Sequence, residues 1–396
     1  LAITGATTIS ASGQDITLDE AASTFGTLAL TGANVAVTDA GATDLGASTV
    51  SGTLSITSGG AVTDSGTLAI TGVTTISASG QNITLDEAAS TYGDLTVTAD
   101  EVYVADAGSL TASSIRANKV QLKAGSGISA TSTGVAEFAA ESNGGDISIT
   151  NTGGYAVSDF ANTSGITGVR LTDTDATGTI TLIANSPLTI NAPVDAGKGS
   201  LQLTASGTAS SDDVTINAAI SGDSVAVQAG DSIAIISGGV TSADLALKAA
   251  SEISLNAPIT SKSADIQAGK NIFLNAAINS PSADIQAGNL ITIDSNAKIS
   301  SSNFNITSEK LNVVPDASVP AFNFSGGTEG DPSFDRYGRV QEATQSDWNN
   351  YFRASETIEL AYGSAGDVVL DQLVVSLISN EASPLNSGEV EVEEEE

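Results

Sequence analysis

Residues 254–272 read SLNAPITSKSADIQAGKNI, and residues 273–291 follow directly with FLNAAINSPSADIQAGNLI. This 19-residue unit is too long for an array of hairpins and too short for a pair of helices. It fits one turn of a β-solenoid, in which two or three short strands are joined by tight bends. The stretch therefore predicts an all-β fold, a parallel β-helix of about 19–24 residues per turn.

The same rhythm extends upstream. Residues 215–233 form another 19-residue unit, TINAAISGDSVAVQAGDSI, and a related phrase starts at Thr189, further from Thr215 than the length of one unit. Inserted residues in a solenoid leave as loops while the strands keep their register. We therefore interpret the longer spacing as a turn with an excursion.

A longer repeat occupies the first quarter of the chain. Residues 1–26, LAITGATTISASGQDITLDEAASTFG, return at 68–93, so that Leu1 corresponds to Leu68. The two copies differ only at Ala6/Val73, Asp15/Asn82 and Phe25/Tyr92. The offset between the copies predicts a duplication of whole turns, about three turns of 20 to 24 residues.

Aliphatic and small polar residues alternate within each unit, as in Leu54 and Ile56, which is typical of strands with one buried face. Glycine, asparagine, aspartate and serine mark the bends. An Asn recurs in the phrase Leu/Ile-Asn-Ala-Pro/Ala, and stacked turns would align these amides into a ladder along one corner. The predicted ladder consists of Asn191, Asn217, Asn256 and Asn275.

Composition limits the partners and the compartment. The chain has 13 basic and 46 acidic residues, a formal net charge of -33, so we expect no binding to nucleic acid. No run of 18 apolar residues is present, which excludes insertion into a membrane by a helix. The absence of cysteine fits an oxidising exterior, so the expected location is secreted or at a bacterial cell surface.

Candidate chemistry is sparse. Asp173 and Asp175 are spaced as in calcium loops, but the segment 171–179 lacks the glycine and the closing glutamate of an EF-hand. We interpret the pair as a surface turn, with weak Ca²⁺ binding as the alternative, and expect no cofactor. The acidic pairs in the two LDEAAS phrases are interpreted as solvated bends. Without histidine or clustered bases and aromatics in the repeats, we expect no enzymatic activity.

The repeats are predicted to end near residue 314, where prolines and aromatic residues become frequent. We expect repeats over 1–314, a cap or assembly region over 315–388 and an acidic disordered tail over 389–396. The chain opens within a repeat, which suggests either a fragment of a longer polypeptide or an end that a neighbour covers. Candidate cap or assembly residues are Leu1, Trp348, Tyr351, Phe352, Val368, Val369, Leu370, Leu373, Val374 and Val375.

The segments TITLIANSPLTINAPVDAGKGSLQLTA and ISLNAPITSKSADIQAGKNIFLNAAI resemble the repeats of filamentous haemagglutinin-like large exoproteins, the adhesins of two-partner secretion. The resemblance covers about 180–310 well and 1–180 loosely, and 315–396 is unmatched. It implies a secreted right-handed parallel β-helix that serves as an adhesin stalk.

Two functions follow as hypotheses. The first is a rigid stalk segment of a bacterial surface exoprotein, with host or neighbouring-cell surface molecules as partners. The second is a self-assembling fibre or surface-layer subunit, in which copies stack end to end through the open first turn and the C-terminal strands. A polysaccharide-processing β-helix enzyme is a remote third alternative, because such enzymes share the fold.

Overall fold

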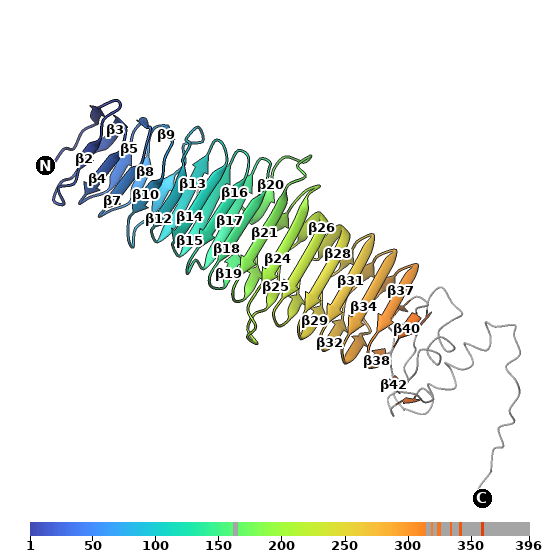
Figure 1. Cartoon of the computed structure of the whole chain (residues 1–396). Helices are drawn as coiled ribbons and strands as arrows, with labels where there is room; N and C mark the ends of the chain where they lie inside the picture. The colour runs from blue at the N-terminus through green and yellow to red at the C-terminus, as the bar shows by residue number, and fades with distance from the viewer. Residues whose placement is uncertain are drawn as a thin grey trace, which may run out of the picture.

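The computed structural model describes residues 1–160 and 165–313, and beyond them the short strands at 318–319, 323–325, 333–334, 340–342 and 358–359. The described residues form strands and no helix. Nearly all of the strands join one parallel sheet that winds into a β-solenoid of about 16 turns, as the repeats predict. Figure 1 shows the result as a straight rod with the N-terminus at one end.

Three sheet faces enclose the core, and face 1 receives a strand from every turn. Its strands are β2 (Ile16–Leu18), β4 (Val35–Asp39), β7 (Leu54–Ser58), β10 (Thr74–Ser77), β12 (Asp94–Thr98), β14 (Leu110–Arg116), β16 (Ile128–Ser132), β18 (Ile147–Asn151), β21 (Thr179–Ala184), β24 (Ser200–Ala205), β26 (Ile220–Ala229), β28 (Val240–Ala249), β31 (Ser263–Ala268), β34 (Ser282–Ala287), β37 (Asn303–Thr307) and β40 (Asn323–Ser325). Because consecutive strands on this face are parallel, every turn is hydrogen-bonded to the next.

Face 2 follows face 1 along the chain. Its strands are β5 (Thr43–Leu45), β8 (Val62–Asp64), β11 (Ile83–Leu85), β13 (Glu101–Asp106), β15 (Lys119–Ala124), β19 (Tyr155–Val157), β22 (Leu188–Ile190), β25 (Val214–Ile216), β27 (Ile233–Ile235), β29 (Glu252–Leu255), β32 (Asn271–Leu274), β35 (Leu290–Ile293) and β38 (Lys310–Val313). Three strands run across faces 2 and 3: β1 (Thr7–Ser10), β3 (Thr27–Gly32) and β17 (Glu137–Ser142).

Face 3 has the shortest strands. They are β6 (Ser48–Val50), β9 (Leu68–Ile70), β20 (Val169–Leu171), β23 (Val194–Asp195), β30 (Ile259–Thr260), β33 (Ile278–Asn279) and β36 (Ile299–Ser300), and the first halves of β26 and β28 complete the face.

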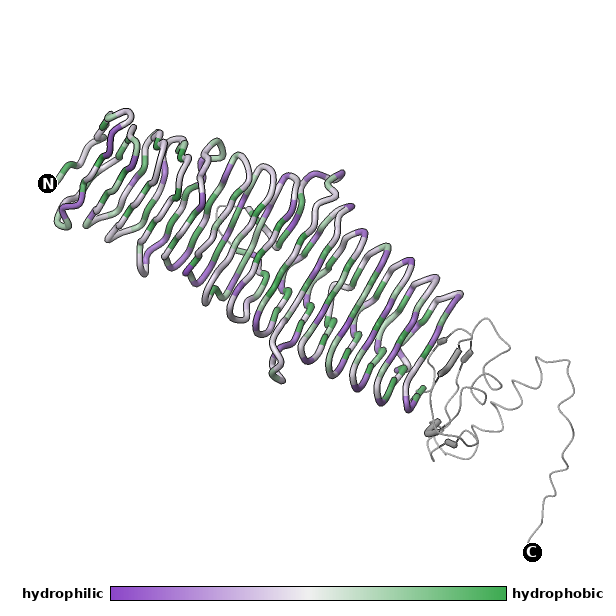
Figure 2. Tube along the Cα trace, in the orientation of Figure 1, coloured by the Kyte–Doolittle hydropathy of each residue, from purple (hydrophilic) through white to green (hydrophobic). Residues whose placement is uncertain are grey.

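The strands form because inward and outward residues alternate. In β7, Leu54 and Ile56 are buried while Ser55 and Thr57 are exposed. Figure 2 shows the same alternation of hydrophobic and hydrophilic residues along the whole tube. The result is one continuous hydrophobic core that follows the axis of the rod.

Turn length varies mainly in the loops, although the register also shifts within β14, between Leu95 and Thr96 of the paired strand β12. Asn256 and Asn275 are 19 residues apart and stack directly, whereas Asp146 and Thr179 stack across 33 residues. Part of that longer segment folds back on the outside of the rod, where Phe160 and other residues form a second small cluster. The insertion therefore adds a surface feature without disturbing the stack.

The long duplication near the N-terminus does not comprise whole turns, contrary to the prediction. β10 is the copy of β1, yet it lies on face 1, three turns above β2 through β4 and β7. The next strand shows the same change of face: β11 is the copy of β2, but it lies on face 2, above β8 and β5. The duplicated unit thus spans three turns and one face, and the second copy is rotated to a different face.

The rotation is tolerated because each copy pairs with the turn that follows it in the same register. Thr7 pairs with Leu28 in the first copy, and Thr74 pairs with Leu95 in the second. Each face demands only inward aliphatic residues on parallel strands, so the same sequence fits either face.

Beyond the predicted boundary at residue 314, β40 pairs in parallel with β37 and continues face 1. Four short strands form two antiparallel pairs: β39 (Ser318–Val319) with β43 (Ile358–Glu359), and β41 (Ser333–Phe334) with β42 (Val340–Glu342). The candidate cap residues from Trp348 to Val375 lie outside the described residues. At the other end, Leu1 is 70% exposed.

Candidate functional site

The predicted asparagine ladder forms two separate pairs. The Asn217 side-chain amide donates to Asn191 at 2.8 Å, and that of Asn275 donates to Asn256 at 2.7 Å. Ile236 occupies the stacked position between the two pairs and is 50% exposed. The amides therefore connect adjacent turns, and the isoleucine interrupts the row because its side chain has no hydrogen-bonding group.

Asp173 and Asp175 lie together in a loop after β20. The Asp175 backbone N–H donates to the Asp173 carboxylate at 3.0 Å, and Lys198 forms an ion pair with Asp175. Over residues 1–160 and 165–313, no group of three or more acidic side chains is arranged to hold a metal ion. The geometry is that of an aspartate-stabilised turn, and it gives the Ca²⁺ alternative no support.

A buried aspartate at the end of β13 was not among the predicted site residues. The Asp106 carboxylate accepts from the backbone N–H of Tyr92 at 3.0 Å and from that of Gly108 at 2.7 Å. Burial raises the pKa of Asp106, although both hydrogen bonds favour its charged form. The side chain connects its own bend to the previous turn.

Asp39 makes the equivalent contact after the first copy of the repeat, with the backbone N–H groups of Phe25 at 3.4 Å and Gly41 at 2.8 Å. The signal was visible in the sequence, because VTDAG at 37–41 and VADAG at 104–108 keep the offset of the duplicated unit. An isolated Asp-Ala-Gly phrase resembles a solvated bend. Only its recurrence at the same offset as the two long copies marks it as a repeated structural contact.

The difference Asp15/Asn82 between the copies is matched by a difference in the facing turn. Asp15 accepts from the side chain of Asn34 at 2.9 Å, whereas Asn82 faces Glu101 at 3.5 Å. Carboxylate and amide have exchanged places, so neither copy stacks two carboxylates here. Glu101 also forms an ion pair with Lys119 of the following turn, at 3.6 Å.

A charged row crosses faces 2 and 3 on the outside of the rod. Glu141 lies between Lys123, at 3.3 Å, and Arg170, at 2.8 Å. Burial alone would raise the pKa of Glu141, but the Arg170 hydrogen bond and the charge of Lys123 bring it below the usual value. The row joins three strands, β15, β17 and β20.

Asp64 is a further buried carboxyl group, at the inward-facing end of β8. Asp64 stacks on Leu45, and its carboxylate accepts from the backbone N–H of Asp86 at 2.8 Å. Burial raises the pKa of Asp64 to about 6, against the lowering effect of hydrogen bonds from the backbone of Asp86 and Glu87. Its second oxygen, Oδ2, and the buried hydroxyl of Tyr92 have no hydrogen-bond partner.

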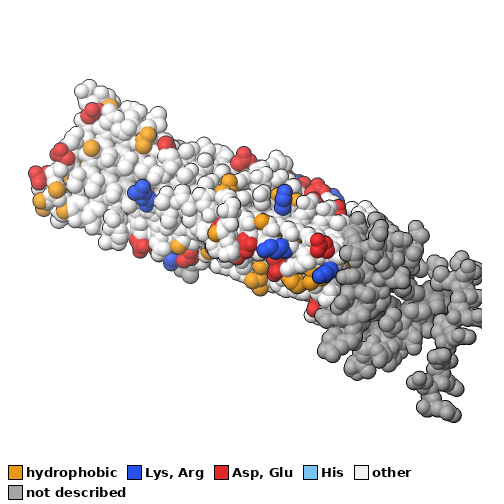
Figure 3. Space-filling view, turned by 60° about the horizontal axis from the view of Figure 1, so that its bottom comes forward, with side chains coloured by type: hydrophobic (Ala, Val, Ile, Leu, Met, Phe, Trp, Pro, Cys, Tyr) orange, Lys and Arg blue, Asp and Glu red, His pale blue; other side chains and the backbone are white. Residues whose placement is uncertain are grey.

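On the face drawn in Figure 3, charged side chains are scattered, with wide uncharged areas between them. Among the described residues, no helix is long and apolar enough to cross a membrane. Most of the polar contacts described above join one turn of the rod to another.

Comparison with known families gives one match. A family model described as repeats of unknown function (DUF5649) matches residues 1–31 and 32–99. The second match spans 68 residues (32–99), which is close to the offset of 67 residues between the two copies (1 and 68). Searches of curated proteins and of solved structures found no match.

Proposed function

We propose that this chain forms a rigid, non-catalytic stalk segment of a secreted bacterial surface protein, which holds an adhesive part away from the cell. The observation that carries the proposal is the unbroken parallel stack, in which every turn pairs with the next. A rod of this kind resists bending because each turn would have to lose several backbone hydrogen bonds to open.

The length of the rod is consistent with a spacer. About 16 turns at the usual strand spacing of roughly 4.8 Å give ~75 Å. Duplication of a unit is a direct way to lengthen such a rod, and the first 99 residues match a family of repeats.

Composition supports the non-catalytic part of the proposal. The sequence has no histidine and no cysteine, and residues 1–115 contain neither lysine nor arginine. General acid–base or nucleophilic catalysis most often uses such residues. The net charge of -33 would keep the rod soluble and would oppose binding to nucleic acid and anionic membranes.

End-to-end assembly is the second candidate. The parallel pairing that joins successive turns within the rod could continue from one copy to a second copy stacked on it. Sedimentation over a range of concentrations tests it: growing filaments support it, and monodisperse rods at every concentration contradict it.

Shortening the rod tests the stalk function. Removal of residues 27–93 joins Gly26 to Asp94 and places β1 beneath β12, where β10 normally lies. The rod should lose three turns and one face, ~16 Å, which small-angle X-ray scattering measures. Removal of residues 254–272 should shorten it by one turn.

Both variants are then displayed on a bacterial surface with a C-terminal epitope tag. If the chain is a spacer, antibody access to the tag should fall in proportion to the length removed, whichever segment is missing. Equal access in all three proteins would contradict the spacer function.

A further inference from the structure

The bend between β17 and β18 contains the dipeptide Asn143–Gly144, the only asparagine–glycine pair in the sequence. Asn143 is exposed, and it stacks on Thr172 of the next turn because Ser142 pairs with Leu171 just before it. The amide carbon of an asparagine side chain can be attacked by the backbone nitrogen of the following residue. Glycine at that position favours the reaction, because it has no Cβ and restricts the backbone least.

The side-chain carbonyl of Asn143 is held by the next turn of the rod. Its Oδ1 accepts from the Thr172 hydroxyl at 3.3 Å, and the same hydroxyl lies 3.4 Å from the backbone carbonyl oxygen of Ser142. The Asn143 backbone is fixed on both sides, since its N–H donates to Ala124 and its carbonyl accepts from Asp173, both at 3.1 Å. A donor at Oδ1 stabilises the negative charge that develops there when the amide carbon is attacked.

The backbone nitrogen of Gly144 is unrestrained by comparison. Its N–H has no hydrogen-bond partner among the residues that the structure describes, and a Cβ at this position would meet nothing within 4 Å. Gly145 differs, because a Cβ there would lie 2.1 Å from the carbonyl oxygen of Ser126 in the preceding turn. The bend therefore combines a fixed electrophile with a nitrogen that is free of the backbone ladder.

A similar contact at the end of β21 serves as a natural comparison. The Oδ1 of Asn185 accepts from the Ser206 hydroxyl of the next turn at 2.9 Å, and Asn185 is exposed as well. The residue that follows is Ser186, which has a side chain where Asn143 is followed by glycine. The two asparagines thus share the hydroxyl donor and differ in the residue whose nitrogen would attack.

We propose that Asn143 and Gly144 form a self-modification site, at which the asparagine is converted to aspartate or isoaspartate without an enzyme. The Gly144 nitrogen loses its proton to solvent and bonds to Cγ of Asn143, while Thr172 donates to Oδ1. The Cγ–Nδ2 bond then breaks, and the amide nitrogen leaves as ammonia with a proton taken from water. One water molecule opens the resulting succinimide ring at either carbonyl, and nothing is oxidised or reduced.

The product fits the bend. An aspartate carboxylate keeps an oxygen that can accept from Thr172, and isoaspartate adds its extra backbone atom beside Gly144, where space is open. The flanking strands β17 and β18 keep their pairing with β20 and β21, because the modified residue lies outside all four strands. The rod should therefore stay folded and gain one negative charge at this corner. The modification is independent of the stalk function.

Peptide mapping of the full folded chain by mass spectrometry, after incubation in oxygen-18 water, tests the proposal. Asn143 should incorporate the heavy oxygen faster than Asn185, at a rate that rises with pH because the attacking nitrogen must lose its proton. Asn118 is the slow internal reference, since it is exposed but the following N–H, that of Lys119, donates to Asp100 at 3.2 Å. Conversion of Asn143 no faster than that of Asn118 would overturn the proposal.

Two substitutions test the assigned parts. Gly144→Ala places a Cβ in open space and should slow the conversion, whereas an unchanged rate would overturn attack by this nitrogen. Thr172→Val removes the donor to Oδ1 and should slow the conversion in the folded rod about five-fold, the rate equivalent of one hydrogen bond. In urea, where the turns no longer stack, Thr172→Val should react as fast as the unaltered chain. Equal rates in the folded state would overturn the role of Thr172.

Discussion

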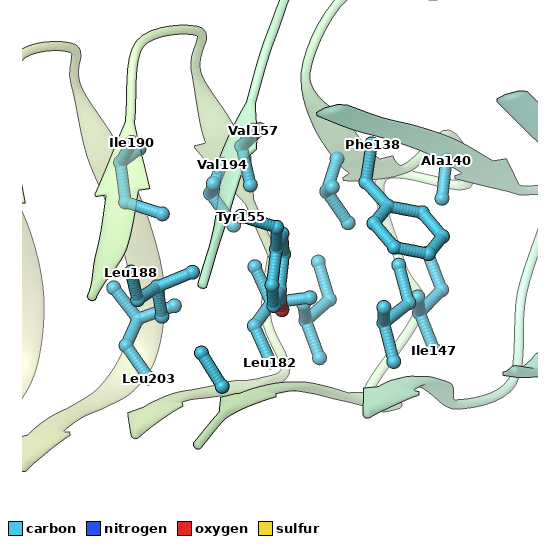
Figure 4. Packing of buried hydrophobic residues seen from close by; sticks show 14 of the residues in the cluster. Phe138, Ala140, Ile147, Tyr155, Val157, Leu182, Leu188, Ile190, Val194 and Leu203 are labelled. Atoms are coloured by element: carbon cyan, nitrogen blue, oxygen red, sulfur yellow. The ribbon is translucent and has the colours of Figure 1, made fainter. Parts of the chain in front are cut away.

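At the residue scale, a few buried polar atoms of the described residues have no hydrogen-bond partner, and the Tyr155 hydroxyl is the clearest case. The ring is 4% exposed and contacts Phe138 edge to face, with ring centroids 5.3 Å apart. Its hydroxyl has no partner, and Figure 4 shows the side chain among aliphatic residues such as Leu182. Burial without a partner raises the pKa of Tyr155 far above its usual value.

Replacement of Tyr155 by phenylalanine should therefore stabilise the rod. The change removes an unsatisfied hydroxyl and keeps the ring contact with Phe138, so we expect a gain of about 1 kcal/mol in the free energy of unfolding. Urea denaturation measures it. A loss of stability would show that the hydroxyl has a partner, and Phe138→Leu is the control for the ring contact.

Asn82→Asp should destabilise the rod, because it places a carboxylate opposite Glu101. We expect a loss of about 0.5 kcal/mol, which salt reduces. The double variant Asn82→Asp with Glu101→Asn reproduces the pairing of Asp15 and Asn34 and should recover the loss. A double-mutant cycle by denaturation checks this, and full additivity of the two changes would contradict direct contact.

Residue patterns predicted part of this picture. The repeated phrase around Asn256 and Asn275 predicted aligned amides, because stacked identical turns must align identical residues. Asp64 could not be recognised as buried, since an aspartate next to a bend is usually solvated, and for Asp106 only the repeated phrase at 37–41 and 104–108 marked a structural contact. Their burial depends on which residues the adjacent turns place against them, and periodicity alone does not reveal that.

At the element scale, neighbouring strands are joined by rows of outward side chains as well as by their backbones. Glu141 of β17 is the most connected example, since it contacts bases of both β15 and β20. The bases are about two-fifths exposed, so solvent weakens each contact.

Glu141→Gln should lower the free energy of unfolding at pH 7 by about 1 kcal/mol. Because the folded pKa of Glu141 lies below 4.5, the contribution is present above pH 4.5 and is lost as the pH falls through the folded value. The difference between the two proteins should thus shrink below pH 4. Thermal unfolding at several pH values measures it, and a difference that is independent of pH would contradict the charge argument.

Ile236→Asn should fill the gap between the two asparagine pairs on face 2. The new amide would stack between Asn217 and Asn256, and we expect a gain of about 0.5–1 kcal/mol. Ile236→Ala is the control, since it removes the exposed side chain without adding an amide. If both variants have equal stability, the row of amides does not stabilise adjacent turns.

At the scale of the whole molecule, the sequence was sufficient to predict the solenoid, but it did not reveal on which face the second copy of the duplicated unit lies. The 19-residue repeat predicted stacked parallel turns, because its length is that of one turn of a β-solenoid. The offset between the two long copies was interpreted as whole turns, whereas the second copy lies three turns and one face further on. Because the turns differ slightly in length, the offset is compatible both with three whole turns and with three turns and one face. Only the strand pairing distinguishes these two arrangements.

The rotation has a consequence for longer arrays of the unit. Each added unit should turn the next copy onto a different face, so that its loops point to another side of the rod. Surface features of the unit, such as the LDEAAS loops, would then be displayed around the rod instead of along one side.

The distance between two spin labels tests the rotated duplication most directly, and the chain has no native cysteine that would compete for the label. Labels at Thr17 and Thr75 should be about 15 Å apart at the backbone, since these residues stack on face 1 across three turns. Labels at Thr8 and Thr75, equivalent in sequence, should be further apart because they lie on different faces. A shorter distance for Thr8 and Thr75 than for Thr17 and Thr75 would contradict the account.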